Sequence, residues 1–377
     1  DPVYLMYTSG STGEPKGVVT THRNVVKTCI NGGYIEVVPH DRMLQLSNYA
    51  FDGSTYEIFA ALLNGATLVL MPDKRRLDAE ELAKTLVHKR ITLAFMTTAL
   101  FNTLVTYDAN CLKGLRKLFF GGEAASPEHV EKALRVVGEG KLINAYGPTE
   151  TTVFATTYDI DRSMEGRHRI PIGKPINNTR CYVVNPWGQW QPIGVPGELW
   201  IAGDGLAMAY WGKSDLTAEK FITHPAFPEE RLYRTGDWVR WLPDGNLEFC
   251  GRMDQQVKIR GHRIELEEVE GAILATRPVA ETAVIAHRDE QGHSMLVAYV
   301  VPKDKEIIEK RPVFSEVLSQ WRKSLKTRLP DYMIPSVFIP LDALPLTHNG
   351  KVNRRALPAP NEWMKREYVT PRTASET

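Results

Sequence analysis

The chain has 377 residues, of which 43% are apolar and 24% charged, and its formal net charge is +1. This composition is typical of a globular protein with two or more domains, and the balanced charge argues against a nucleic-acid or membrane-surface partner. No apolar run approaches the roughly 18 residues of a membrane span, and the four scattered cysteines predict neither a zinc site nor a disulfide framework, so we expect a cytoplasmic protein.

The first distinctive stretch is YTSGSTGEPKG at residues 7–17. Its glycines, hydroxyl side chains and single lysine predict a loop that surrounds anionic oxygens such as those of phosphate. Walker A spacing is absent, because only Glu14 and Pro15 separate Gly13 from Lys16, and this disfavours a P-loop nucleoside triphosphatase. Taken alone, the stretch could also be a solvated loop rich in serine and glycine.

Strand and helix patterns alternate from residue 65 to residue 150. Apolar runs at 66–72, 91–97 and 115–121 predict strands, with helices expected after the caps Asp78 and Ser126. Such alternation predicts a parallel sheet whose ligands bind beyond the carboxyl ends of the strands. A further strand is expected at 141–146, and the residues that would lie at this edge are Gly121, Gly122, Glu123 and Tyr146 to Glu150.

The pattern of apolar and turn-forming residues changes twice in the remainder of the chain. Residues 170–251 contain short apolar runs separated by turn sequences, which predicts antiparallel strands. Next come a helix at 265–276, a hairpin over 281–302 and a helix at 314–329, which together predict a small α+β unit. The fold class is therefore a multi-domain α/β protein.

Four further stretches carry more polar residues than a structural role requires: NAYGPTET, YRTGDW, GRMDQQVKIRGHRIELEEVE and LPLTHNGKVNRRALP. Each alone has a structural alternative, because Tyr146 could pack, Glu150 could cap a turn and Asp237 could hold an Asx-turn. In this order, together with YTSGSTGEPKG, they resemble the adenylate-forming superfamily. More narrowly, residues 4–358 are similar to an amino-acid adenylation domain of a nonribosomal peptide synthetase.

The resemblance implies a domain organisation. A large adenylation core would span residues 1–253, with an α/β part over 1–168, a β-rich part over 169–253, and the N-terminal portion of the family fold missing. A small mobile α+β domain would span 254–358, with Asp254 as its hinge. Residues 359–377 would form a linker toward a carrier domain.

The resemblance also implies the chemistry. Such enzymes join a carboxylate to the α-phosphate of ATP with Mg²⁺, release pyrophosphate, and transfer the acyl group to a phosphopantetheine thiol. Lys351, Lys16 and Thr12 would be catalytic, and Glu150 would bind the metal ion. Tyr146 would stack on adenine and Asp237 would accept the ribose hydroxyls. The residues assigned to the nucleotide are Ser9, Gly10, Ser11, Thr12, Gly13, Lys16, Gly122, Glu123, Asn144, Tyr146, Gly147, Thr149, Asp237 and Arg252.

The substrate class follows from a second set of matching positions. Asp52 in YAFDGSTYEIF would pair with the α-ammonium group of an amino acid, which fatty and aryl acids lack. The pocket around the substrate would consist of Asp52, Gly53, Tyr56, Phe95, Phe119, Gly121, Ala145, Val153, Phe154 and Lys351. Apart from Asp52 and Lys351, none of these side chains is charged or an amide, so we expect an apolar, branched aliphatic substrate, with Gly53 and Gly121 leaving room for it.

One residue departs from the family pattern, and two other functions also fit the sequence. Asn353 stands where the family commonly has Asp, which removes any salt bridge made by that Asp. An acyl- or aryl-CoA ligase of the same superfamily would share every nucleotide motif, and a non-catalytic nucleotide-binding module is an alternative of another class. The expected partners are the amino-acid substrate and the downstream peptidyl carrier and condensation domains of the same synthetase, without nucleic acid or membrane.

Overall fold

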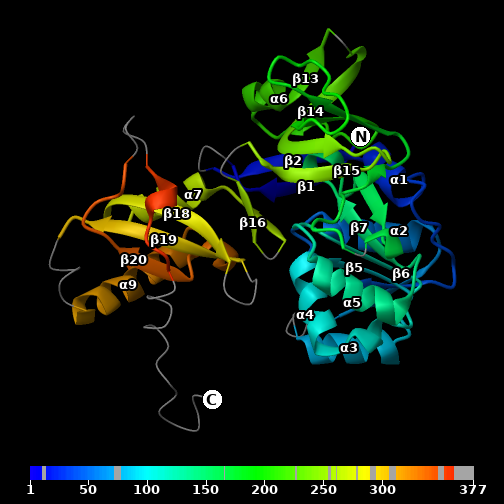
Figure 1. The fold of residues 1–377 in the computed structure, drawn as a ribbon, viewed down its shortest axis with the longest axis horizontal. Helices are drawn as coiled ribbons and strands as arrows, with labels where there is room; N and C mark the ends of the chain where they lie inside the picture. The colour runs from blue at the N-terminus through cyan, green and yellow to red at the C-terminus, as the bar shows by residue number, and fades with distance from the viewer. Residues whose placement is uncertain are drawn as a thin grey trace. The chain divides into compact units, whose positions relative to one another are not determined.

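The computed structural model describes residues 1–10, 14–71, 78–164, 166–225, 227–253, 256–259, 261–276, 279–288, 294–304, 311–346 and 352–360. The chain forms two compact units (Figure 1). The first unit contains Asp1–Thr8 and Pro15–Asp254, and the second contains Ser9–Glu14 and Gln255–Thr377.

A seven-stranded sheet organises the first unit, in the order β4-β3-β5-β6-β7-β8-β9. The first five strands of that order are parallel, whereas β8 and β9 are antiparallel additions at one side. All four strands predicted between residues 65 and 150 are confirmed, as β4, β5, β6 and β7. The bounds are β3 Arg42–Gln45, β4 Thr67–Leu70, β5 Leu93–Thr97, β6 Lys117–Gly121, β7 Leu142–Tyr146, β8 Thr156–Asp159 and β9 Lys174–Pro175.

Helices cover both faces of this sheet, which explains why its central strands are apolar on both sides. On one face lie α3 (Ala79–His88), α4 (Thr98–Asp108) and α5 (Pro127–Val137), stacked beside β5 and β6 in Figure 1. On the other face lie α1 (His22–Cys29) and α2 (Gly53–Leu63).

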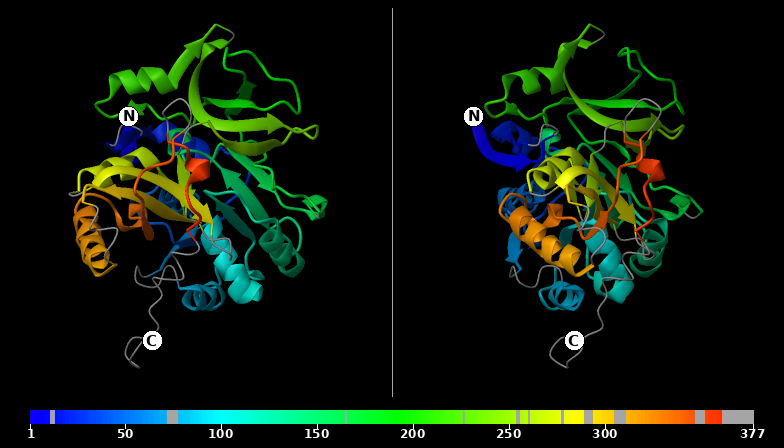
Figure 2. Two further views of the ribbon diagram at one scale, coloured as in Figure 1. Left: turned by 60° about the vertical axis from the view of Figure 1, so that its left-hand side comes forward. Right: turned by 90° about the vertical axis from the view of Figure 1, so that its left-hand side faces the viewer.

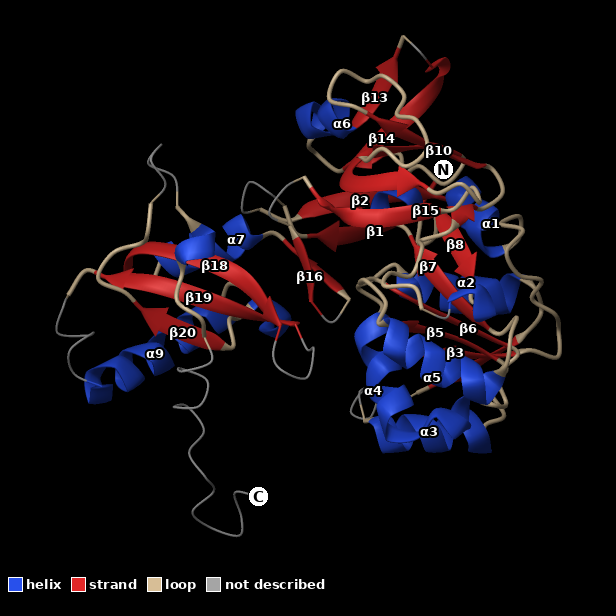
Figure 3. Ribbon diagram, viewed as in Figure 1, coloured by secondary structure: helices blue, strands red, loops and turns tan. Residues whose placement is uncertain are grey.

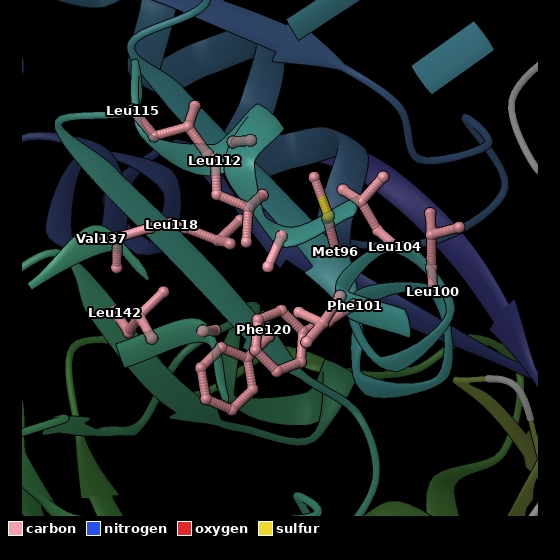
Figure 4. Packing of buried hydrophobic residues seen from close by; sticks show 14 of the residues in the cluster. Met96, Leu100, Phe101, Leu104, Leu112, Leu115, Leu118, Phe120, Val137 and Leu142 are labelled. Carbon is pink, nitrogen blue, oxygen red and sulfur yellow. The ribbon is translucent and has the colours of Figure 1, made fainter. Parts of the chain in front are cut away.

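The two successive phenylalanines of β6 show how the faces differ. Phe120 belongs to the core under α3, α4 and α5, where its ring stacks on Phe101 at 4.5 Å between centroids (Figure 4). Phe119 belongs to the cluster on the opposite face. Side chains alternate along a strand, so neighbouring residues serve different cores.

Both predicted helix starts are confirmed in position, but only one of the two predicted capping residues makes a capping hydrogen bond. Asp78 caps α3 by accepting from the backbone N–H groups of Glu80 (2.9 Å) and Glu81 (3.1 Å). Ser126 precedes α5 but makes no capping bond, because its hydroxyl bonds instead to Nδ1 of His129 at 2.8 Å. The expected capping role of Ser126 is therefore wrong, and the competing imidazole is the reason.

The β-rich part of the first unit is antiparallel, as the turn sequences predict (Figure 3). One sheet contains β10 (Thr179–Val184), β11 (Gly197–Gly203), β13 (Phe221–His224), β14 (Phe227–Trp241) and β15 (Leu247–Arg252), with α6 (Ser214–Lys220) beside it. A second sheet joins β1 (Pro2–Thr8), β2 (Lys16–Thr21) and β12 (Ala209–Tyr210). Short 3-10 helices occupy Ala109–Leu112, Thr149–Thr151 and Arg162–Met164.

The second unit is the expected α+β unit. Its sheet has the order β18-β19-β20, and α7 and α9 pack on one face of it (Figure 2). The parallel pairing of β20 with β19 was not predicted, since its four-residue run is too short to indicate a strand by pattern alone. The bounds are β16 Val257–Ile259, β17 His262–Ile264, α7 Leu266–Leu274, β18 Val279–Arg288, β19 Ser294–Pro302, α9 Arg311–Lys326 and β20 Val337–Pro340, with 3-10 turns at Asp331–Met333 and Arg354–Ala356.

Across the described ranges, no helix is long and apolar enough to cross a membrane.

Candidate active site

The predicted site residues of the first unit gather at the carboxyl edge of the seven-stranded sheet. Gly122 and Glu123 directly follow β6, and the turn from Gly147 to Glu150 directly follows β7. The two strands are hydrogen-bonded neighbours, with Gly121 opposite Ala145. Polar residues that are more than twenty positions apart in the sequence therefore meet at one edge.

A buried carboxylate on β14 is the first feature of this edge. Asp237 is 3% exposed, and Arg252 lies opposite it on β15. The guanidinium donates to Oδ1 of Asp237 at 2.6 Å, and the hydroxyl of Tyr146 donates to Oδ2. Burial, reinforced by the Asp237 carboxylate, raises the pKa of Tyr146 well above its usual value, so this phenol remains a donor. Asp237 can thus accept two hydrogen bonds at once, as two ribose hydroxyls would require.

A second buried carboxylate lies in the turn after β7. Glu150 is fully buried, and its Oε1 lies 3.5 Å from Nζ of Lys16 and accepts from the hydroxyl of Tyr210 at 2.7 Å. The ammonium of Lys16 also lies 5.1 Å from the centroid of the Tyr210 ring. The structure thus brings together Lys16 and Glu150, which the sequence predicted separately. No motif marked Tyr210, whose position follows from the pairing of β12 with β2.

The surroundings of Glu150 bear on its predicted role as a ligand for Mg²⁺. In the described part of the chain, no three His, Cys, Asp or Glu side chains lie close enough together to form a metal cage. Mg²⁺ is commonly held by one or two carboxylates together with substrate phosphates and water. A single carboxylate beside a lysine fits that mode of binding and does not fit a permanent protein-only metal centre.

The first residues of the phosphate-loop motif make their contacts inside the second unit. The Ser9 hydroxyl donates to the carbonyl oxygen of Arg263 at 2.9 Å, and the Gly10 N–H donates to Oε2 of Glu268 at 3.3 Å. A Cβ atom on Gly10 would lie 2.0 Å from the carbonyl oxygen of Glu14, so there is no room for a side chain at this position. Five predicted site residues lie outside the described residues, namely Ser11, Thr12, Gly13, Asp254 and Lys351.

Asp52 occupies the N-cap position of α2 and is half-buried. Its side chain makes no capping hydrogen bond at the start of the helix. The start of the helix is anchored elsewhere, by Glu57, which is fully buried and accepts from the Ser47 hydroxyl at 2.8 Å and from its N–H at 3.0 Å. Glu57 was not among the residues predicted from the sequence.

The predicted pocket residues form an aromatic cluster on the α1–α2 face of the sheet. Tyr56, Phe119 and Phe154 are at most 2% exposed, whereas Phe95 is half-buried. Phe154 stacks on Phe119 with 5.8 Å between ring centroids and meets Phe95 edge-on at 5.4 Å. Tyr34, which no sequence signal marked, meets both Phe119 and Phe154 edge-on at 5.7 Å.

The two pocket glycines do not open space in the way the sequence reasoning expected. A Cβ atom on Gly53 would lie 2.7 Å from the Phe95 ring, so that ring already fills the adjacent volume. A Cβ atom on Gly121 would lie 2.1 Å from the carbonyl oxygen of Ala145, so this glycine permits the close approach of β7. The expectation about volume is therefore wrong at both positions.

The remaining predicted residues have mainly backbone-shaping positions. The Asn144 side chain donates to the carbonyl oxygen of Pro171 at 2.7 Å and is 4% exposed. Gly122 has a φ of +91°, and a Cβ atom on Gly147 would lie 2.4 Å from the carbonyl oxygen of Val153. Thr149 begins the short 3-10 helix that carries Glu150.

A doubly wound sheet with two buried carboxylates near its carboxyl edge, each held by a cationic side chain and a tyrosine, is suited to binding a nucleotide. The chain belongs to the AMP-binding enzyme family. The family model for AMP-binding enzymes matches residues 1–211, and the model for the AMP-binding enzyme C-terminal domain matches residues 268–351.

Similar proteins agree with this assignment. The chain is 49% identical to bacitracin synthase 3 of Bacillus licheniformis and 46% identical to surfactin synthase subunit 3 of Bacillus subtilis strain 168, in both cases over 100% of its own length. It spans only 6% and 29% of those two proteins, respectively.

Among solved structures, it is similar to holo-PA1221, a nonribosomal peptide synthetase (NRPS) protein containing adenylation and PCP domains, with a TM-score of 0.83 and 32% identity over 98% of this chain and 61% of that one. A second structure of PA1221 matches with a TM-score of 0.80 and 31% identity, over 97% of this chain and 69% of that one. The resemblance to a nonribosomal peptide synthetase adenylation domain is confirmed.

Proposed function

We propose that this chain activates an apolar, branched aliphatic amino acid with ATP as the aminoacyl adenylate, and then passes the acyl group to the phosphopantetheine thiol of a carrier domain. The observation that carries the proposal is the buried pair of Glu150 and Lys16 at the carboxyl edge of the sheet. A fully buried glutamate beside a buried lysine is costly for a purely structural purpose. It suits a site that manages phosphate charge.

The nucleotide would be held by its ribose and its phosphates. Asp237 would exchange the Tyr146 and Arg252 donors for the two ribose hydroxyls, which its two carboxylate oxygens can accept together. Lys16 would offset charge on the phosphates, and Glu150 would hold Mg²⁺ there. When bound, the metal ion would neutralise phosphate charge as a Lewis acid.

The amino acid would lie beside the aromatic cluster. Asp52 would accept the α-ammonium group, as its match to the family's amino-acid motif implies, and it lies at the start of α2. The side chain would face Phe95, which is the half-buried member of the cluster. A polar substrate group would find no partner among these rings, so an apolar side chain is favoured.

The domain roles are part of the same proposal. Residues 1–253 would form the large core and residues 254–358 a small domain that carries Lys351 and turns about Asp254, with 359–377 as a linker. Lys351 would bridge the substrate carboxylate and the α-phosphate during adenylation only. Carrier and condensation domains of the same synthetase would be the partners, and a cytoplasmic location stays a prediction.

Amino-acid-dependent exchange of labelled pyrophosphate into ATP tests the proposal, run over all twenty amino acids on the longest natural polypeptide that contains this chain. We expect exchange with valine, isoleucine or leucine. Preferential exchange with lysine, glutamate or asparagine would contradict the apolar pocket, and no exchange with any amino acid would indicate a non-catalytic module.

A substitution at the ammonium site sharpens this test against the ligase alternative. Asp52→Ala should weaken amino-acid activation by about 2–5 kcal/mol, as expected when a charge partner is removed. Asp78→Ala is the matched control, since it also removes an aspartate at an N-cap position and affects only the start of α3. Activation of an ammonium-free acid with CoA as acceptor would identify an acyl- or aryl-CoA ligase instead.

A further inference from the structure

Helix α1 carries a buried lysine that no step of the proposed reaction uses. Lys27 is 3% exposed, and its Nζ donates to the carbonyl oxygen of Phe154 at 3.0 Å. Desolvation lowers the pKa of this lysine to about 8. A lysine buried at this cost suggests that the carbonyl it binds must be held in place.

The carbonyl lies in a strained segment. Thr152 and Val153 are successive non-glycine residues with positive φ angles of 60° and 68°. Such residues are uncommon, and a β-branched residue in this region is a genuine outlier that surrounding contacts must maintain. The segment directly precedes Phe154, the residue whose ring stacks on Phe119 in the aromatic cluster.

A second residue of α1 holds the other end of the segment. The Thr28 hydroxyl donates to the carbonyl oxygen of Thr152 at 3.0 Å. The hydroxyl of Thr152 itself donates to the carbonyl oxygen of Gly205 at 2.9 Å. Neighbouring side chains of α1 thus bind the backbone on both sides of Val153.

Gly205 makes room for this arrangement. A Cβ atom at that position would lie 2.8 Å from Nζ of Lys27 and 2.8 Å from the carbonyl oxygen of Thr151. The same loop is tied to α1 by Asn24, whose side chain donates to the carbonyl oxygens of Asp204 at 2.6 Å and Leu206 at 3.0 Å. Helix α1 therefore fixes two loops at once.

We propose that Lys27 and Thr28 are positioning residues of the amino-acid pocket, which hold the left-handed segment Thr152–Val153 and thereby fix the ring of Phe154. The inference rests on the proposed function, because it assigns Phe154 to the substrate pocket. The two hydrogen bonds themselves do not depend on that function, because they go to backbone carbonyl oxygens and neither residue is placed at the nucleotide. Loss of either bond lets the segment relax toward ordinary φ angles and shifts the aromatic cluster.

Threonine variants give the sharpest test. Thr28→Val keeps the shape of the side chain and removes the hydroxyl, whereas Thr28→Ser keeps the hydroxyl. Thr282→Val is the matched control, because the Thr282 hydroxyl also donates to a backbone carbonyl, that of Tyr299, at 2.8 Å and lies in the second unit. Lys27→Met tests the other bond while retaining an apolar stem of similar length.

In pyrophosphate exchange, Thr28→Val and Lys27→Met should raise the KM for the preferred amino acid by about five- to tenfold, the effect of one lost hydrogen bond. The KM for ATP should change less than about twofold, as expected for a residue that contacts no nucleotide. Thr28→Ser and Thr282→Val should retain the wild-type values. Equal increases in both KM values, or an unchanged KM for the amino acid, would overturn the inference.

A second measurement needs no substrate and separates this inference from the proposed function. Amide hydrogen exchange of residues 153–155 should be about tenfold faster in Thr28→Val than in the wild type or Thr282→Val, since local opening follows the lost contact. Unchanged protection would overturn the positioning role whether or not the wild type exchanges pyrophosphate. Suppose instead that the wild type activates no amino acid, but amide hydrogen exchange is still faster in Thr28→Val. That result would support the positioning role of Thr28 and contradict only the proposed function.

Discussion

The two halves of the candidate site are built by different physical means. On the side proposed to bind the nucleotide, Asp237 and Glu150 are buried carboxylates whose oxygens are held by tyrosine hydroxyls and cationic side chains. On the side proposed to bind the amino acid, the cluster around Phe119 and Phe154 is held by ring packing, and Lys27 and Thr28 bind the backbone next to Phe154.

The difference shows what each half can tolerate. A buried charge whose partner is removed loses most of its compensation, so the nucleotide side should respond to single substitutions with large losses. An apolar cluster can repack, so the amino-acid side should respond with graded changes in selectivity. The nucleotide half is therefore suited to one invariable ligand, and the aromatic half is suited to adjustment between substrates.

The largest effect is expected for Glu150→Gln. The change removes the charge beside Lys16 and the proposed metal ligand, so pyrophosphate exchange should fall about 10³-fold, the upper range for one electrostatic contact in a transition state. Glu248→Gln is the control, because Glu248 is also buried and charge-paired, with Arg240 at 2.8 Å, and is not one of the predicted site residues. A similar loss in both variants would show that Glu150 is only structural.

A smaller loss is expected at the ribose position. Asp237→Asn weakens one acceptor and should raise the KM for ATP about 30-fold, the scale of hydrogen bonds to a charged group. The KM for the amino acid provides an internal control and should stay within about twofold of the wild type. An increase confined to the amino acid would mean that the two halves are assigned the wrong way round.

On the aromatic side, two successive residues of β6 form a matched pair. Phe119→Leu and Phe120→Leu each alter a fully buried ring and should each cost about 1 kcal/mol of unfolding free energy. Only Phe119 faces the pocket cluster, so only its variant should change the preference among apolar amino acids, by about tenfold toward larger side chains. Equal shifts in selectivity would contradict the division of the sheet into a pocket face and a core face.

The smallest effect is a pH dependence at Lys27. Its pKa is about 8 in the folded protein, and its ordinary value is 10.5, so between these values the unfolded chain binds more protons. Relative to Lys27→Met, the free energy of unfolding of the wild type should therefore rise by about 1 kcal/mol between pH 8 and pH 9. Both proteins keep the neighbouring groups Asp204, Cys181 and Cys29, so the difference between their free energies of unfolding reports on Lys27. Denaturant unfolding at several pH values measures this difference.

A flat difference across that pH range would show that Lys27 is not desolvated in solution. A difference that falls with pH would give the opposite sign, as expected only if the folded state bound the proton more tightly.

Much of the fold could be predicted from the sequence because hydrophobic period and capping residues are local signals. The strands of the parallel sheet and the cap at Asp78 are examples. The charge partners of the site were harder, since Tyr210 reaches Glu150 only through the pairing of β12 with β2. Motif order placed Glu150 and Lys16 at the site, but nothing in their spacing showed that they form an ion pair.

The pocket shows the same limit. A list of aromatic positions predicted an apolar site, whereas volume depends on how rings and backbone pack. Gly121 is required by a strand that approaches it, and the space beside Gly53 is occupied by Phe95. The role of Tyr34 and the hydrogen bonds from α1 to the Thr152–Phe154 backbone could not be predicted from the sequence, because both arise from contacts between segments distant in the chain.

The most direct test of the central claim is a competition among substrates. All twenty amino acids are supplied at equal concentration with ATP and Mg²⁺, and the adenylates are trapped with hydroxylamine and quantified as hydroxamates by mass spectrometry. We predict that hydroxamates of branched aliphatic amino acids predominate, and that Phe119→Leu changes their ratio while Phe120→Leu does not. Predominance of a charged or amide side chain, or hydroxamates that form without ATP, would contradict the account.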